Sequence, residues 1–109
     1  MTLSTHVLDT THGTPATGVR LRLLSGPHVL FDGVTNGDGR CPELKTLAHK
    51  PGHYRLEFWV ADYFRGRKVA LSEPPFLDVV GIDFAMADDS HYHVPLLVSP
   101  YGYSTYRGS

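Results

Sequence analysis

The sequence predicts an all-β fold, an antiparallel sandwich of about eight strands, and two patterns lead to this prediction. Apolar and polar residues alternate over several short windows, which is the period of half-buried strands. Turn signals built from Gly, Pro, Asn and Asp separate these windows so closely that little room remains for helices. A chain of 109 residues matches one domain with one core, so we expect a single domain over residues 1–109.

The alternation also places the elements along the chain. Strand windows occupy residues 3–8, 19–23, 54–60 and 80–84. A short helix is expected near residues 61–67, where Tyr63 and Phe64 interrupt the strand period. The closing segment, residues 92–109, is unusually apolar and aromatic for a chain end, and residues 99–102 form the expected turn of a hairpin. This segment therefore belongs to the centre of a sheet or packs against another subunit, and both can hold.

Composition excludes several classes of function. The formal net charge of −1 provides no basic surface for nucleic acid or for a membrane. No stretch approaches the ~20 apolar residues of a membrane helix, and no signal peptide is visible, so the cytoplasm is the expected compartment. Cys41, the single cysteine, cannot form an internal disulfide, and we expect it to fill space beside a turn rather than act as a nucleophile.

Histidines are frequent, and some of them lie in expected strands. Of the seven, four stand beside or close to Gly or Pro in turns and are expected to face solvent: His12, His28, His49 and His53. His6 lies in the first strand, whereas His91 and His93 share one face of the penultimate strand. Such a pair can share a metal ion, but no recognisable ligand pattern completes the site, so we expect no metal. A metalloenzyme that uses His91 and His93 remains an alternative, which turnover in the presence of a chelator would exclude.

Arg40 is the other residue that could carry chemistry. It follows the turn sequence NGDG at residues 36–39, which presents it at the start of a strand. Taken alone, an arginine after a turn is a solvated surface charge. The chain carries no Ser or Cys nucleophile motif, phosphate-binding loop or dinucleotide fingerprint. Pattern alone therefore yields a β-sandwich with a few histidines and an arginine of open purpose.

Three segments of the chain resemble the motifs of one known family, the transthyretin-related 5-hydroxyisourate hydrolases. They are residues 4–16, with STHVLDT and GTPA; residues 35–40, with TNGDGR; and residues 91–109, with HYHVPLL and SPYGYSTYRGS. The final YRGS is the most specific, because transthyretin itself lacks it. The motifs span the chain in the family's order, and only residues 65–87 match loosely.

The resemblance implies a transthyretin-like fold and a homotetramer, built as a dimer of dimers with the active sites in a central channel. It implies hydrolysis of a small molecule, 5-hydroxyisourate, to 2-oxo-4-hydroxy-4-carboxy-5-ureidoimidazoline in urate degradation, with no metal or organic cofactor. The family's site residues carry over to His6, Arg40, His93 and the terminal stretch 106–109. Transthyretin has Lys, Glu and Thr at the first three positions, so this chain carries the hydrolase set.

The roles that we expect follow from the residue types. Either His6 or His93 is the general base on water, and the other orients the water or protonates the leaving nitrogen. Arg40 binds and polarises the substrate, Tyr106 hydrogen-bonds it and Ser109 completes the pocket. Two other classes of protein remain as alternatives: a carrier of a small aromatic ligand in the same channel, and a structural sandwich whose histidines are incidental.

Overall fold

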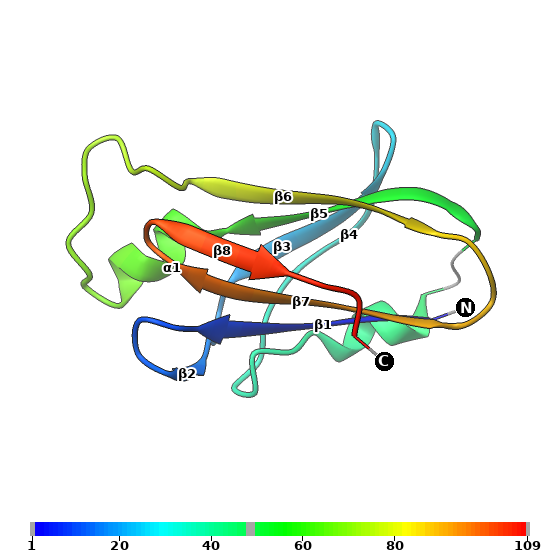
Figure 1. Cartoon of the computed structure of the whole chain (residues 1–109), viewed down its shortest axis with the longest axis horizontal. Coiled ribbons are helices and arrows are strands. Elements are labelled where there is room, and N and C mark those ends of the chain that lie inside the picture. Colours follow the sequence, from blue (N-terminus) through cyan, green and yellow to red (C-terminus); the bar gives the residue numbers. More distant parts are fainter. Residues whose placement is uncertain (1, 48–49, 109) are drawn as a thin grey trace.

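The computed structural model describes residues 2–47 and 50–108, and within these ranges the chain forms eight strands, one α-helix and one 3-10 helix (Figure 1). The strands make two four-stranded sheets that face each other across the core. The elements are β1 (Thr2–Asp9), β2 (Thr14–Pro15), β3 (Arg20–Ser25), β4 (His28–Val34), η1 (Pro42–Thr46), β5 (Gly52–Trp59), α1 (Val60–Gly66), β6 (Val79–Met86), β7 (His91–Ser99) and β8 (Gly102–Thr105). The expected all-β sandwich with one short α-helix is confirmed.

The first sheet has the strand order β2-β1-β7-β8, and its central pair, β1 and β7, runs parallel. All other strand pairs are antiparallel. The sequence prediction did not include this parallel pair, which joins strands from opposite ends of the chain. In its register Thr2 pairs with His91 and Ser4 pairs with His93. The beginnings of the two strands therefore lie side by side, and this places the first motif next to the last.

The second sheet has the order β4-β3-β5-β6 and supplies much of the core. Leu21 and Leu23 of β3 pair with Phe58 and Leu56 of β5, and all four side chains are fully buried. Arg22 lies between the two leucines on the opposite face of the sheet. The alternation of apolar and charged residues in these windows thus separates the two faces, as the period of two predicted.

The helix α1 begins at the end of β5 and buries Tyr63 beneath the far end of β1. The Tyr63 hydroxyl donates to the buried carboxylate of Asp9 over 2.7 Å, and the His12 main chain and ring contact the same carboxylate at 3.0 and 2.5 Å. Burial alone would raise the pKa of Asp9, but the hydrogen bonds from Tyr63 and His12 outweigh it and lower the pKa. His12, expected to be a plain surface residue, therefore helps to hold a buried charge.

The closing segment divides into an inner strand and an edge strand. In β7 the side chains of Val94, Leu96 and Val98 are buried, and the expected hairpin follows, with Ser99 paired to Gly102. By contrast, all four residues of β8 are exposed, and β8 forms the edge of its sheet (Figure 1). Only the first half of the segment thus takes the central position that its apolar composition allowed.

Candidate active site

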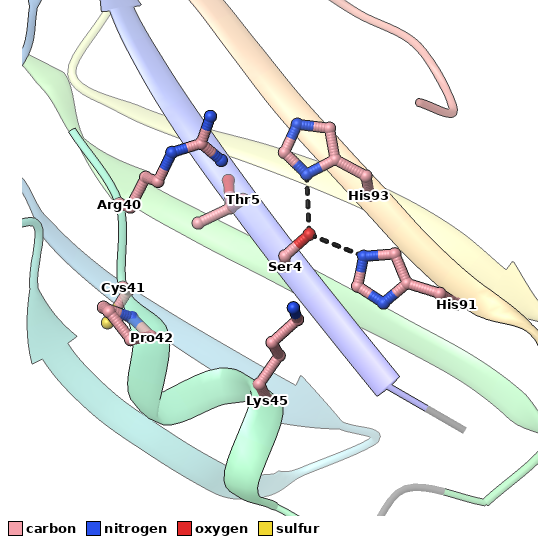
Figure 2. A pocket seen from close by; sticks show the side chains of 8 residues that line it. All are labelled: Ser4, Thr5, Arg40, Cys41, Pro42, Lys45, His91 and His93. Carbon is pink, nitrogen blue, oxygen red and sulfur yellow. Dashed lines mark hydrogen bonds between the residues drawn. The ribbon is translucent and has the colours of Figure 1, made fainter. Parts of the chain in front are cut away.

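A polar pocket of about 420 Å³ lies where β1 and β7 meet the loop that leads into η1 (Figure 2). Its walls carry imidazole, guanidinium, amine and hydroxyl groups. The lining residues are Ser4, Thr5, Arg40, Cys41, Pro42, Lys45, His91 and His93. All three motifs that the sequence analysis singled out thus contribute to the pocket: Ser4 and Thr5 come from the first, Arg40 from the second, and His91 and His93 from the third.

The parallel pairing of β1 with β7 brings the pocket residues together. On β1 the odd-numbered residues Leu3 and Val7 are buried, so Ser4 lies on the opposite face of the strand. On β7 Tyr92 is buried, and His91 and His93 lie on the opposite face. The expectation that the two histidines share a face is therefore met.

The hydroxyl of Ser4 lies between these two imidazole rings. Ser4 Oγ is 2.7 Å from Nδ1 of His93 and 2.9 Å from Nε2 of His91 (Figure 2). The second nitrogen of His91, Nδ1, forms a hydrogen bond with the Thr2 hydroxyl. These contacts form one continuous chain of four side chains, which the sequence analysis did not foresee because it depends on the register between β1 and β7.

Arg40 is held by a loop that Asn36 organises. The Asn36 side-chain oxygen accepts hydrogen bonds from the main-chain amides of Asp38 and Arg40, both at 3.0 Å. Gly39 adopts a φ of +72°, and its carbonyl accepts a 2.8 Å hydrogen bond from the Val7 amide, so the loop is docked on β1. The turn that the sequence predicted before Arg40 therefore fixes where the guanidinium enters the pocket.

His6 lies beside this loop rather than in the pocket wall. Its main chain forms an isolated bridge with Arg40, which places the two residues next to each other. Of the residues carried over to the site, Arg40 and His93 line the same pocket. His6 lies two residues beyond Ser4 on β1, and it contributes to the electrostatic environment of His93.

His93 is held in its neutral form by its surroundings. Burial is the largest cause and lowers the pKa of the imidazole below its ordinary value. The positive charge of Arg40 lowers this pKa further, as do the electrostatic interactions with His91 and His6, whereas hydrogen bonding to Ser4 opposes them. A ring that resists protonation has a free lone pair near neutral pH, so His93 can accept a proton there.

The C-terminal segment packs against His93 from the other side. The Gly108 amide donates a 2.7 Å hydrogen bond to the His93 carbonyl. Arg107 stacks on the Tyr92 ring at 4.0 Å and donates to Ser90 Oγ over 3.0 Å, which anchors the segment along β7. The C-terminal segment thus reaches the site through the main chain of Gly108.

Tyr106 and Ser109 complete the set of residues that the sequence singled out. Tyr106 is 60% exposed and lines a different hollow, of about 220 Å³, together with Ile82 and Val94. Within one chain it therefore does not share the pocket of Arg40 and His93. Ser109 lies outside the described residues.

Two further residues of the pocket were not foreseen as parts of a site. Lys45 of η1 extends its amine toward Ser4 (Figure 2), and it adds a positive charge to the pocket lining. Cys41 is only 3% exposed, and burial, with the nearby Glu43 carboxylate, raises the pKa of its thiol to about 11. Because the thiolate is the reactive form, this cysteine is inert at neutral pH and packs as the sequence suggested.

Among the residues that the structure describes, no group of three or more His, Cys, Asp or Glu side chains is arranged to hold a metal ion. Instead, both ring nitrogens of His91 have hydroxyl partners, Thr2 and Ser4. Across the same described ranges, no helix has the length and apolar character needed to cross a membrane.

Comparisons with known proteins agree on one family. The family model described as "HIUase/Transthyretin family" matches residues 3–108. A Pseudomonas aeruginosa protein named 5-hydroxyisourate hydrolase is 50% identical over 114 residues, which cover 98% of this chain and 90% of that protein.

Two solved structures show the same fold. A Klebsiella pneumoniae 5-hydroxyisourate hydrolase superposes with a TM-score of 0.86 at 36% identity, over 99% of this chain and 93% of that one. Sea bream transthyretin, in complex with thyroxine, superposes with a TM-score of 0.85 at 27% identity, over 99% of this chain and 95% of that one. The expected transthyretin-like sandwich is thereby confirmed.

Proposed function

The chain belongs to the HIUase/Transthyretin family, and from this membership we propose that it is a hydrolase that acts on 5-hydroxyisourate. The product is 2-oxo-4-hydroxy-4-carboxy-5-ureidoimidazoline, and the reaction is a step of urate degradation. The observation that carries the proposal is the 50% identity, over 98% of this chain, to a relative with that name. The meeting of Arg40 and His93 in one polar pocket supports it independently.

In the proposed mechanism, His93 is the general base on water. Hydrolysis of the cyclic amide requires that water lose a proton as it attacks the carbonyl carbon, and that the leaving nitrogen gain one. A neutral imidazole whose pKa is lowered by burial and by Arg40 suits the first task. Proton transfer of this kind contributes about 10²- to 10⁴-fold to a rate.

Arg40 and His6 act beside this base. The planar, permanently charged guanidinium of Arg40 binds a ring carbonyl and stabilises the negative charge that develops on its oxygen. His6, bridged to Arg40 through the main chain, orients the water or protonates the leaving nitrogen. No metal or organic cofactor is required in this scheme, since the pocket supplies both a proton acceptor and a positive charge.

We further propose that residues 1–109 act as one domain and that four copies assemble as a dimer of dimers. The edge position of β8 supports assembly, because an unpaired edge strand is a template for pairing with another chain. Three exposed aromatic side chains lie on or beside this strand: Tyr103 within β8, and Tyr101 and Tyr106 at its two ends. In such an assembly Tyr106 and Ser109 bind substrate at the channel between dimers. Native mass spectrometry checks the tetramer, and a monomer at micromolar concentration contradicts it.

A carrier of a small aromatic ligand is the second candidate. The similarity to sea bream transthyretin, whose structure contains thyroxine, is the observation that favours it. The polarity of the pocket argues against it, because two imidazoles, a guanidinium and an amine suit a polar purine better than an apolar ligand.

The deciding experiment generates 5-hydroxyisourate from urate with urate oxidase and follows its ultraviolet decay. Hydrolase activity predicts a decay rate that rises in proportion to the protein and is unchanged by a chelator. A matched sample of the variant Arg40→Gln, folded by circular dichroism, should restore the spontaneous rate. Decay at the spontaneous rate with the wild-type protein contradicts the hydrolase and favours the carrier.

A further inference from the structure

The chain of hydrogen bonds behind His93 has no assigned task in the proposed mechanism. It runs from Nδ1 of His93 to the Ser4 hydroxyl, from there to Nε2 of His91, and from Nδ1 of His91 to the Thr2 hydroxyl. All four side chains are partly buried. Figure 2 shows the second ring nitrogen of His93 turned away from Ser4.

The single hydroxyl hydrogen of Ser4 restricts which groups donate and which accept in this series of hydrogen bonds. A serine hydroxyl has one hydrogen, so it donates to only one of the two rings that it contacts. If His93 carries its proton on Nδ1, that N–H donates to Ser4 and the Ser4 hydroxyl donates to Nε2 of His91. The Nδ1–H of His91 then donates to Thr2, and every contact in the chain has one hydrogen.

This ordering is the one that leaves His93 competent as a base, because its Nε2 keeps a lone pair. The reverse ordering puts the proton on Nε2 and makes His93 a donor toward the pocket. The partner of the ring nitrogen that faces away from a substrate therefore decides what the other nitrogen can do. For His93 that partner is Ser4.

We infer that Ser4 and His91 form a proton relay that holds His93 as the Nδ1–H tautomer and accepts the proton that His93 takes from water. The inference rests on the proposed function and deepens it, since it concerns the same site. Ser4 and His91 are positioning residues, because they act through His93.

The relay balances as follows. Water gives one proton to Nε2 of His93 while its hydroxide forms the new bond to the carbonyl carbon. The Nδ1–H proton of His93 moves to Ser4, and the Ser4 proton moves to Nε2 of His91, which becomes an imidazolium. When the carbon–nitrogen bond breaks, His93 delivers its Nε2 proton to the leaving nitrogen, and both relay protons return. Of the two tasks open to His6, this scheme leaves the orientation of the water. The net change is the addition of one water across the amide bond.

The surroundings of His93 explain why proton transfer to His91 would be favourable. Burial and the positive charge of Arg40 disfavour an imidazolium at His93, and both lower its pKa. Because the relay passes a proton on to His91, His93 does not become positively charged while substrate occupies the pocket. Its ring is neutral after the attack of water and again after the carbon–nitrogen bond breaks.

Kinetics of Ser4 variants test the positioning role. Ser4→Ala removes the hydroxyl, and we expect kcat to fall about 10- to 100-fold with KM little changed, the size typical when the partner of an active histidine is lost. Ser4→Thr keeps a hydroxyl and should restore most of kcat. Ser25→Ala, on β3 of the other sheet, is the matched control and should behave as wild type.

A double-mutant cycle separates this role from direct contact with substrate. In a His93→Asn background, Ser4→Ala should cause no further loss, because Ser4 then has no ring to hold. A loss of the same size in both backgrounds would overturn the inference, as would an unchanged kcat in Ser4→Ala alone.

His91→Gln tests the relay itself. The glutamine amide can accept a hydrogen bond from Ser4 but cannot take up a proton. Ser4 therefore still positions His93, but the relay loses its final proton acceptor. We expect kcat to fall about tenfold while His93 keeps its tautomer. Full activity in His91→Gln contradicts the relay.

Nitrogen-15 NMR of the histidine rings reads the tautomer without any turnover. We expect His93 as Nδ1–H in the wild-type protein and a shift toward Nε2–H in Ser4→Ala. Nε2–H in the wild type overturns the proposed ordering. If the wild-type protein does not accelerate 5-hydroxyisourate decay, the proposed function fails and the catalytic use of the relay fails with it, while the NMR spectrum still decides the hydrogen-bond ordering.

Discussion

The Gly108 amide donates a 2.7 Å hydrogen bond to the His93 carbonyl, and Gly108 packs so closely that a Cβ atom there would lie 2.6 Å from Cδ2 of the His93 ring. His93 is therefore confined from two sides, by Ser4 through its ring nitrogen and by the chain end through its ring edge. The glycine of the family's terminal motif thus matters because it has no side chain, which lets the main chain lie close against the His93 ring.

Gly108→Ala should displace the His93 ring and reduce kcat on 5-hydroxyisourate by about 10- to 100-fold, since small misplacements of a reacting group have effects of this size. The melting temperature should change little, because Gly108 lies outside the hydrophobic core. Gly66→Ala is the control, since a Cβ there meets no atom within 4 Å. A fully active Gly108→Ala protein would show that the His93 position is not set by this contact.

Gly39→Ala should destabilise the loop that carries Arg40. Gly39 has a φ of +72°, and a Cβ there would lie 2.5 Å from the Val7 carbonyl oxygen. Gly13→Ala is a matched comparison, because Gly13 has a φ of +71° with no atom within 4 Å of an added Cβ. Both lose about 1–3 kcal/mol through backbone strain, and Gly39→Ala should lose more. Urea unfolding at one protein concentration measures the difference, and equal losses contradict the role of the Val7 contact.

The activity should persist below the ordinary histidine pKa of about 6.5. His93 works as a base only when neutral, and its pKa is lowered, so activity is present above that lowered pKa and is lost as the pH falls through it. Arg40→Gln removes one cause of the shift, so the pKa of His93 should rise. NMR titration of the His93 ring measures this, with Arg20→Gln on the other sheet as the control. An unchanged His93 titration in Arg40→Gln contradicts the electrostatic coupling.

Tyr63→Phe should weaken the fold without touching the pocket. It removes the 2.7 Å hydrogen bond to the buried Asp9 carboxylate, and a hydrogen bond to a charged group contributes about 1.5–3 kcal/mol to the free energy of unfolding. Because the pKa of folded Asp9 is lowered, its contribution is present above the unfolded value of about 3.9 and is lost as the pH falls through the folded one.

In Tyr63→Phe the pKa of Asp9 should rise toward its ordinary value, so acid unfolding should begin at a higher pH. Circular dichroism along an acid titration and urea unfolding at neutral pH, both at a fixed protein concentration, measure these two effects. An unchanged acid midpoint would mean that the hydroxyl does not stabilise the Asp9 charge.

The alternation in β3 and β5 and the turn before Arg40 could be predicted from the sequence because both are local properties. A period of two separates the two faces of a strand, and Asn36 and Gly39 meet the demands of a tight turn wherever it lies. The short helix was expected at residues 61–67 and is found at Val60–Gly66 for the same reason. By the same local logic, His91 and His93 were expected on one face of β7.

The position of Ser4 beside those two histidines could not be predicted from local sequence patterns. Ser4 is 89 residues from His93, and nothing in either segment specifies that β1 and β7 run parallel with Ser4 opposite His93. A shift by one residue would turn Ser4 into the core and break the chain of hydrogen bonds.

By itself, the sequence determined the sandwich, the motifs and the residue types available for chemistry, because strand period, turn chemistry and family resemblance are all written in short stretches of chain. Tertiary structure alone decided which of these residues meet. It placed Arg40 and His93 in one pocket, set His6 beside them, left Tyr106 at a different hollow and brought Ser4 between two imidazoles. The physical reason is that the register of a non-local strand pair is chosen by the burial of the whole core, and not by the residues that form the site.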